Sequence, residues 1–224
     1  MPYRAAAALV AVCLAAFAAL AVDVTHDGGL ARLDLRIARW NAADRPGWLE
    51  STAHPFSSVG GAIGMAVVAV AAAAWLARRR RVVAALIVLL TYGVAQATTV
   101  GLKEAFHRPR PDVGSAIPLP HSFSFPSGHA LGAFATLTVA ALLLGTSRGA
   151  GHVTAWYKRL PLALALVLAA LVAASRVILN VHYLTDVVAG GCVGFSIAVT
   201  AACIDVVIGR KRSVRRGSIR PSPR

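Results

Sequence analysis

Six apolar runs separated by short polar segments dominate the chain. A helix needs about 20 residues to cross the roughly 30 Å apolar core of a bilayer. Four of the runs approach that length, and the fourth and fifth are each extended by an adjoining polar cluster. The pattern predicts an all-α bundle of six transmembrane helices, and the runs are Ala5–Val22, Ser57–Leu76, Val82–Leu102, Ala130–Leu144, Leu160–Ala174 and Val187–Ile208.

Composition supports a membrane bundle. The chain is 57% hydrophobic and only 14% charged, whereas soluble domains are roughly 45–50% apolar and about 25% charged. The net charge is +14, but the cations collect between apolar runs and in the C-terminal tail, where they attract anionic headgroups, so nucleic acid is not an expected partner. Cys13, Cys192 and Cys203 lie inside apolar runs and form neither a disulfide framework nor a metal knuckle.

Lysine and arginine are divided unevenly between the two sides of the predicted bundle. One side carries fifteen of them, including Arg4, Arg78–Arg81, Arg148 and the basic tail, and the other side carries eight. By the positive-inside rule the richer side is cytoplasmic. The three polar clusters then lie on the extracytoplasmic face of the cell membrane, and the C-terminus is cytoplasmic.

Three regions are expected along the chain. Residues 1–56 hold the first apolar run, which is either a retained helix or a cleaved secretory signal, and a segment in which Leu30, Leu33, Ile37 and Trp40 recur at helical spacing. That segment predicts an amphipathic helix, lying in the membrane interface or packed on the bundle. Residues 57–208 form the catalytic core, and residues 209–224 form a basic, disordered tail.

The most informative polar cluster for mechanism is Ser175-Arg176 followed by His182 and Asp186. If the last helix begins near His182, the histidine and the aspartate lie four residues apart and share a face. The carboxylate would accept the Nδ1 proton of the ring and leave Nε2 as a free lone pair. His182 is therefore the candidate nucleophile, which would attack phosphorus to give a phosphohistidine.

The cluster Pro126-Ser127-Gly128-His129 opens the fourth helix. Helix N-termini bind anions through free N–H groups and the helix dipole. Gly128 allows a close approach of the backbone to phosphate, and the hydroxyl of Ser127 would act as an N-cap or as a phosphate donor. His129 is the candidate general acid, which would protonate the leaving oxygen.

Lys103, Arg110 and Arg176 supply the remaining positive charge. Guanidinium groups bind phosphate through paired donors, and lysine acts as a point charge. Charge spread over three equatorial oxygens in phosphoryl transfer calls for several fixed cations. The alternative is that these residues anchor helix ends, which would also account for Arg108.

Together the clusters closely resemble the motifs of the type 2 phosphatidic acid phosphatase family, which shares them with vanadium haloperoxidases. The family pattern is Lys-x6-Arg-Pro, Pro-Ser-Gly-His and Ser-Arg-x5-His-x3-Asp, and the chain matches it at Lys103, Arg110, Pro111, Pro126, Ser127, Gly128, His129, Ser175, Arg176, His182 and Asp186. The resemblance implies a phosphomonoesterase or diphosphatase that needs no metal and no cofactor. It also implies phosphate binding by Lys103, Arg110, Ser127, Gly128 and Arg176, with His129, His182 and Asp186 catalytic.

The leading hypothesis is a phosphatase whose partner is a lipid phosphate in the membrane, such as a polyprenyl diphosphate, phosphatidate or phosphatidylglycerol phosphate. A phosphotransferase would use the same intermediate with an alcohol as acceptor. A haloperoxidase is disfavoured, because six spans suit a lipid better than a halide. A lipid-phosphate carrier would need only the cations and would normally place ionisable groups at mid-membrane, where this chain has almost none.

Overall fold

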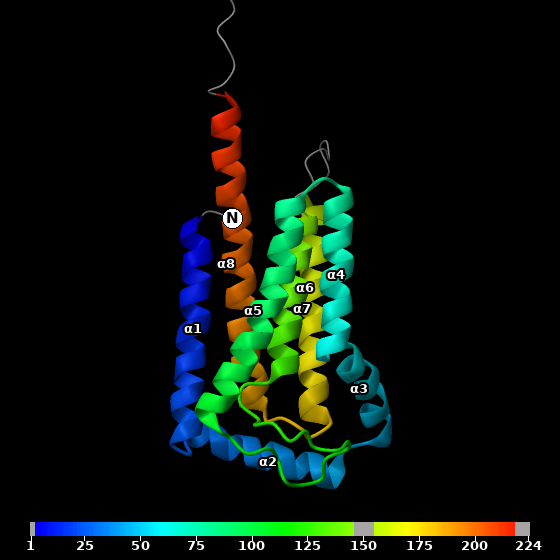
Figure 1. Ribbon diagram of the computed structural model, residues 1–224. Helices are drawn as coiled ribbons and strands as arrows, with labels where there is room; N and C mark the ends of the chain where they lie inside the picture. The colour runs from blue at the N-terminus through cyan, green and yellow to red at the C-terminus, as the bar shows by residue number, and fades with distance from the viewer. Residues whose placement is uncertain (1–2, 146–154, 218–224) are drawn as a thin grey trace, which may run out of the picture.

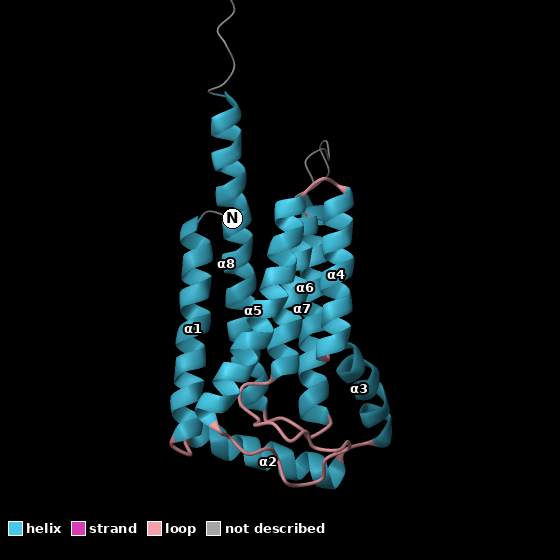
Figure 2. Ribbon diagram, viewed as in Figure 1, coloured by secondary structure: helices cyan, strands magenta, loops and turns pink. Residues whose placement is uncertain are grey.

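The computed structural model describes residues 3–145 and 155–217, and this part of the chain contains helices and connecting segments without a strand (Figure 2). Five of the six apolar runs each form one helix. The second run, Ser57–Leu76, is divided at Gly60 and Gly61 between two helices, of which the first begins at Gly47, and one further helix precedes them. The helices are α1 (Tyr3–Thr25), α2 (Gly29–Asp44), α3 (Gly47–Val59), α4 (Ala62–Arg78), α5 (Val82–Phe106), α6 (Gly128–Leu144), α7 (Ala155–Ile178) and α8 (Leu184–Gly217).

Six of these helices, α1 and α4 to α8, run side by side in one bundle (Figure 1). Four stretches within the described residues are long and apolar enough to cross a membrane, namely α1, α5, Leu160–Ile178 of α7 and Leu184–Arg210 of α8. A fifth span results if α3 and α4, which meet at a 53° bend, count as one. The all-α bundle is confirmed, and the expected count of six requires the shorter helix α6 as well.

Helix α6 lies at the centre of the bundle, where it packs against α4, α5, α7 and α8. It is only 17 residues long and is apolar on every side, as expected for a helix surrounded by other helices rather than by water. Its contact with α8 is especially close because Gly190 and Gly194 face it. A Cβ at Gly190 would lie 2.5 Å from the carbonyl oxygen of Ser127, and one at Gly194 would lie 2.3 Å from that of Leu131.

Helix α2 lies across one end of the bundle (Figure 1). Leu30, Leu33 and Trp40 are 45%, 42% and 57% exposed, whereas the buried positions include Asp34 and Asn41. The apolar face that was expected to meet the bundle or the membrane therefore points away from the bundle, and a polar face docks onto it. Asn41 makes part of this contact by donating from Nδ2 to the carbonyl oxygen of Val177 at 2.6 Å.

Helix α8 begins at Leu184, close to the expected start near His182, after the chain turns through Asn180, whose φ is +57°. The same helix continues to Gly217, although disorder was expected from residue 209; the last tail residues, 218–224, lie outside the described residues. The cation Arg148 of the topology count also lies outside them.

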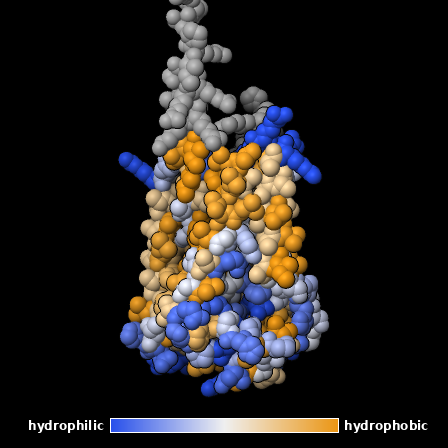
Figure 3. Space-filling model, in the orientation of Figure 1, coloured by the Kyte–Doolittle hydropathy of each residue, from blue (hydrophilic) through white to orange (hydrophobic). Residues whose placement is uncertain are grey.

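The surface divides into bands along the bundle. In Figure 3, apolar residues cover the sides of the helices, and hydrophilic residues gather at the end that carries α2 and the connecting loops. The turn that contains Arg78–Arg81 joins α4 to α5 at the opposite end (Figure 1). The polar clusters predicted as the site therefore lie at one end of the bundle and the four consecutive arginines at the other.

Candidate active site

The fold brings all three polar clusters together. Lys103 lies in the last turn of α5, Gly128 and His129 open α6, and Arg176 lies in the last turn of α7. His182 lies in the turn between α7 and α8, and Asp186 lies in the first turn of α8. Helix ends from four parts of the chain thus supply the site, and the loop from residue 107 to residue 127 closes it.

His182 is held between a carboxylate and a guanidinium. Its Nδ1 lies 3.3 Å from Oδ2 of Asp186, and its Nε2 lies 3.1 Å from Nη1 of Arg110. A guanidinium can only donate, so Nε2 must be the acceptor and the ring proton must sit on Nδ1. Burial lowers the pKa of His182 to about 4, although the hydrogen bond that the ring donates to Asp186 opposes this shift. The ring is therefore neutral at pH 7, with a lone pair on Nε2.

Asp186 is fully buried and accepts hydrogen bonds from several directions. Besides His182, the backbone N–H of Tyr183 donates to it at 2.9 Å and the hydroxyl of Ser124 donates to the same oxygen. Arg108 reaches the other carboxylate oxygen at 2.5 Å. Such saturation fixes the carboxylate in one orientation and favours its charged form.

The sequence suggested only the anchoring of a helix end for Arg108, whereas the structure places its guanidinium against Asp186. Its guanidinium bridges Asp186 and the buried Asp34 of α2, whose Oδ2 lies 2.9 Å from Nη2. Burial alone would lower the pKa of Arg108, but the two carboxylates raise it above its ordinary value. Nothing in the local sequence marks Asp34 or Ser124 as partners, because each contact joins segments more than 60 residues apart.

Lys103 and Arg110 converge on the short segment Ser122–Phe123. Nζ of Lys103 donates to Oγ of Ser122 at 3.0 Å and to the carbonyl oxygen of Phe123 at 2.5 Å. Nε of Arg110 donates to the carbonyl oxygen of Ser122 at 2.8 Å, and its Nη1 donates to that of Val181 at 2.7 Å. The segment Ser122–Phe123 therefore fixes the side chains of two cations that were predicted to bind phosphate.

Arg176 is 3% exposed and donates from Nη1 to the hydroxyl of Ser57 near the end of α3. Its Nε atom is buried and has no hydrogen-bond partner. A buried guanidinium N–H without an acceptor is costly in a structure, and an anion at this position would satisfy it. The contribution of Ser57 was not foreseen from the sequence.

The N-terminus of α6 faces the same region. Ser127 is the N-cap residue, but its hydroxyl makes no capping hydrogen bond and is buried without a partner. Its backbone N–H donates to the carbonyl oxygen of Asp186 at 3.0 Å, which ties the start of α6 to the start of α8. The N-cap hydrogen bond considered for this hydroxyl is absent, and its role as a phosphate donor stays a prediction.

His129 follows at the second position of α6. A Cβ built at Gly61, just before α4, would lie 3.6 Å from its Nε2, so the ring points toward the bend between α3 and α4. Arg176, His182, Lys103 and Arg110 all interact electrostatically with the ring. No group of three or more His, Cys, Asp or Glu side chains is arranged to hold a metal ion anywhere in the described residues.

The arrangement has the parts of an oxyanion receptor beside the imidazole of His182. A helix N-terminus, three cations and a buried hydroxyl can hold a tetrahedral anion, and Nε2 of His182 presents a lone pair beside Arg110. Fixed donors of this kind stabilise developing charge without reorganising during the reaction.

Comparison with known proteins gives consistent matches. The sequence model of the PAP2 superfamily matches residues 84–208. The phosphatidylglycerophosphatase B of Bacillus subtilis is 30% identical over 205 residues, covering 90% of this chain and 97% of that protein. The decaprenylphosphoryl-5-phosphoribose phosphatase of Mycobacterium tuberculosis is 36% identical over 126 residues, or 55% of this chain and 60% of that protein.

Solved structures agree with the sequence matches. The crystal structure of a transmembrane PAP2 type phosphatidylglycerolphosphate phosphatase from Bacillus subtilis superposes with a TM-score of 0.80 and 28% identity, covering 89% of this chain and 96% of that one. LpxE of Aquifex aeolicus shares the fold, with a TM-score of 0.56 and 24% identity over 78% of this chain and 95% of that one. Both the family match and the full-length relatives place this chain in the PAP2 superfamily, as a multi-pass membrane protein and a phosphoric ester hydrolase.

Proposed function

We propose that this protein is a lipid phosphate phosphatase that works through a phosphohistidine on His182. The observation that carries the proposal is the ring of His182, whose proton is held on Nδ1 by Asp186 while Nε2 faces Arg110. The Nε2 lone pair accepts from Arg110 at 3.1 Å, and it becomes available to attack phosphorus when Arg110 turns to the phosphate oxygens. Asp186 would stabilise the positive charge that the ring acquires.

In the first step, Nε2 of His182 forms a bond to phosphorus as the bond between phosphorus and the leaving oxygen breaks. His129 gives its proton to that oxygen, so the lipid leaves as an alcohol. From a diphosphate, the leaving group is a protonated lipid phosphate. In the second step, the oxygen of a water molecule forms a bond to phosphorus as the bond between phosphorus and Nε2 of His182 breaks, and the water loses a proton to His129. Phosphate is released, and both histidines return to their starting forms.

Lys103, Arg110 and Arg176 would hold the nonbridging oxygens, assisted by Ser127 and Gly128. This assignment accounts for the buried hydroxyl of Ser127 and the buried Nε of Arg176, which have no protein partner. Charge stabilisation comes from these fixed donors, so the mechanism uses neither a metal nor a cofactor.

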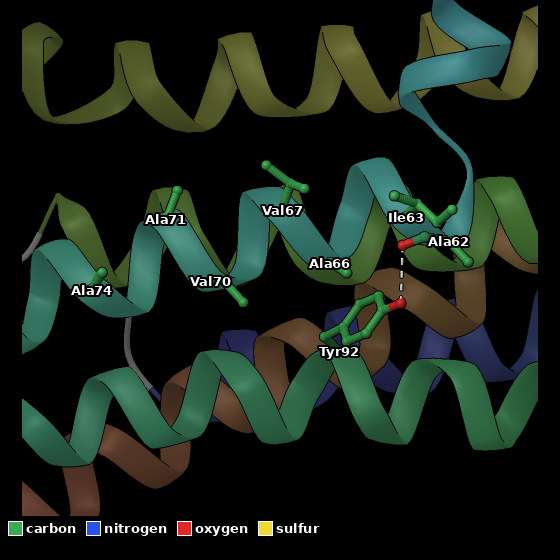
Figure 4. A pocket seen from close by; sticks show the side chains of 8 residues that line it. All are labelled: Ala62, Ile63, Ala66, Val67, Val70, Ala71, Ala74 and Tyr92. Carbon is green, nitrogen blue, oxygen red and sulfur yellow. Dashed lines mark hydrogen bonds between the residues drawn. The ribbon is translucent and has the colours of Figure 1, made fainter.

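The lipid part of the substrate fits an apolar groove between α4 and α5, of about 520 Å³. The groove is lined along α4 from Ala62 to Ala74 and by Tyr92 of α5, whose hydroxyl donates to the carbonyl oxygen of Ala62 (Figure 4). Ala62 follows Gly61, the residue that faces His129. A tail in the groove would therefore place its headgroup at the site.

Phosphatidylglycerol phosphate is the first substrate to test, because the phosphatidylglycerophosphatase B relative matches over nearly its whole length. We place the site on the extracytoplasmic side of the plasma membrane. The uneven distribution of lysine and arginine supports this orientation, since Arg78–Arg81 lie at the far end of the bundle.

The test is phosphate release by the detergent-purified protein in the presence of EDTA. The panel is phosphatidylglycerol phosphate, phosphatidate, a polyprenyl diphosphate and a soluble phosphomonoester. We expect phosphate release from at least one lipid. The release should disappear in His182→Ala and persist in the control His26→Ala, which replaces an exposed histidine. Activity that needs added metal, or that survives in His182→Ala, would overturn the mechanism. Transfer of phosphate to an added alcohol in preference to water would identify a phosphotransferase instead.

A further inference from the structure

Asp34 is a buried carboxylate outside the three sequence motifs. It lies on the polar face of α2 and is 1% exposed. Its Oδ1 accepts from the backbone N–H of Thr185 at 3.1 Å, and its Oδ2 accepts from the Thr185 hydroxyl and from Nη2 of Arg108 at 2.9 Å. Every one of these partners is a direct neighbour of Asp186, in sequence or by hydrogen bond.

Arg108 stands between the two carboxylates. Nη1 contacts Asp186 at 2.5 Å and the Thr185 hydroxyl at 2.8 Å, and the guanidinium lies over the ring of Tyr183, 4.2 Å from its centroid. One face and both terminal nitrogens of Arg108 are thus restrained, and a rigid donor helps to fix the acceptor that it binds. Through this contact, Asp34 is linked to the Asp186 carboxylate, which Ser124, Tyr183 and His182 also contact.

The charges of the group matter as well as its geometry. If Arg108 met Asp186 alone, the pair would be neutral, and Asp186 would stabilise a positive charge on His182 less well. With Asp34 included, two carboxylates and one guanidinium leave one net negative charge beside the ring. That charge is needed when the ring carries phosphate and becomes cationic.

We propose that Asp34 is a positioning residue for the hydrolysis, which holds Arg108 and Thr185 so that Asp186 stays oriented and anionic toward His182. The proposal rests on the phosphohistidine mechanism above. It gives the crossing helix α2 a part in the chemistry. The same helix exposes Leu30, Leu33 and Trp40 on its other face.

Docking of α2 does not depend on Asp34 alone. Asn41 donates to the carbonyl oxygen of Val177, and Arg45, just after the helix, donates to those of Ile178 and Gly114 at 3.1 and 3.3 Å. These contacts hold the helix against the turn before α8 without touching Asp186. Burying a carboxylate and its partner is rarely the cheapest way to attach a helix, so a function for Asp34 beyond attachment is expected.

The experiment compares Asp34→Asn with Asp34→Glu and with Asp44→Asn, which removes an exposed carboxylate from the end of the same helix. Steady-state kinetics are measured on the purified full chain with the lipid that the wild type hydrolyses. Asparagine keeps the shape and removes the charge, so kcat is expected to fall about 10- to 100-fold with KM within about threefold, as for other small displacements of catalytic groups. Asp34→Glu is expected to recover part of the loss, and Asp44→Asn to match the wild type.

A double substitution separates positioning from simple destabilisation. If Asp34 acts through Arg108, the loss of kcat in Asp34→Asn/Arg108→Gln is clearly smaller than the product of the two single losses, because both substitutions disturb the same contact to Asp186. A wild-type kcat for Asp34→Asn, with only a lowered Tm, would overturn the proposal, as would fully additive losses in the double variant. His182→Ala is run beside them: its failure to abolish activity would sink the mechanism itself, whereas an inactive His182→Ala with a fully active Asp34→Asn would sink only the role of Asp34.

Discussion

Replacing Gly190 by alanine tests how closely the site depends on the packing of α8 against α6. The added Cβ would lie 2.5 Å from the carbonyl oxygen of Ser127, whereas ordinary contacts begin near 3.4 Å. The backbones must therefore separate by about 0.9 Å, since neither atom belongs to a flexible side chain. The backbone hydrogen bond from Ser127 to Asp186, 3.0 Å long, spans the same contact.

A displacement near 1 Å between catalytic groups costs about 100-fold in rate, or about 2.7 kcal/mol of transition-state stabilisation. We therefore expect Gly190→Ala to lower kcat/KM about 100-fold in the phosphate-release assay. Overpacking should also cost about 1–3 kcal/mol of stability. The matched control is Gly93→Ala on α5, where an added Cβ meets nothing within 4 Å. If Gly190→Ala keeps the kcat/KM and the Tm of Gly93→Ala, the close contact does not set the geometry of the site.

Three further predictions concern single side chains. Burial lowers the pKa of His182 to about 4, below its ordinary 6.5, so only the unfolded chain takes up this proton between those values. The free energy of unfolding is therefore unaffected by this proton above pH 6.5 and decreases as the pH falls from 6.5 to 4. Unfolding measurements should show the wild type losing about 3 kcal/mol more of this free energy than His182→Gln over that range. Ser57→Ala should raise KM several-fold with little change in kcat, because Arg176 loses the hydroxyl that fixes it; an unchanged KM would contradict this. Arg110→Lys should lower kcat/KM at least about 10-fold, since an ammonium cannot contact Ser122, Val181 and His182 together; kinetics within twofold of the wild type would argue against that role.

The sequence predicted the helix bundle and the residues of the candidate site from local patterns along the chain. Apolar runs of about 20 residues mark bundle helices regardless of their partners, and the structure has a helix at each of the six. Local spacing also placed His182 and Asp186 within reach of each other, although the expected helix begins two residues later than His182. Both inferences depend only on residues close together along the chain.

The contacts that complete the site lay beyond that range. Asp34, Ser57 and Ser124 each contact site residues more than 60 positions away, and no local period marks them. On α2 the sequence pattern marked the apolar stripe that contains Leu30 and Leu33, whereas the buried face is the one that carries Asp34. Helix α2 exposes Leu30, Leu33 and Trp40 and buries Asp34, which reverses the usual rule that apolar faces point inward.

The central claim is that phosphate passes through a covalent bond to Nε2 of His182. The most direct measurement is rapid quenching of the purified protein during turnover of phosphatidylglycerol phosphate labelled in its terminal phosphate, followed by peptide mapping. We predict a label that is stable in alkali, labile in acid, located on the peptide that contains His182, and missing from His182→Ala. Turnover without any label on the protein, or label on another residue, would contradict the account.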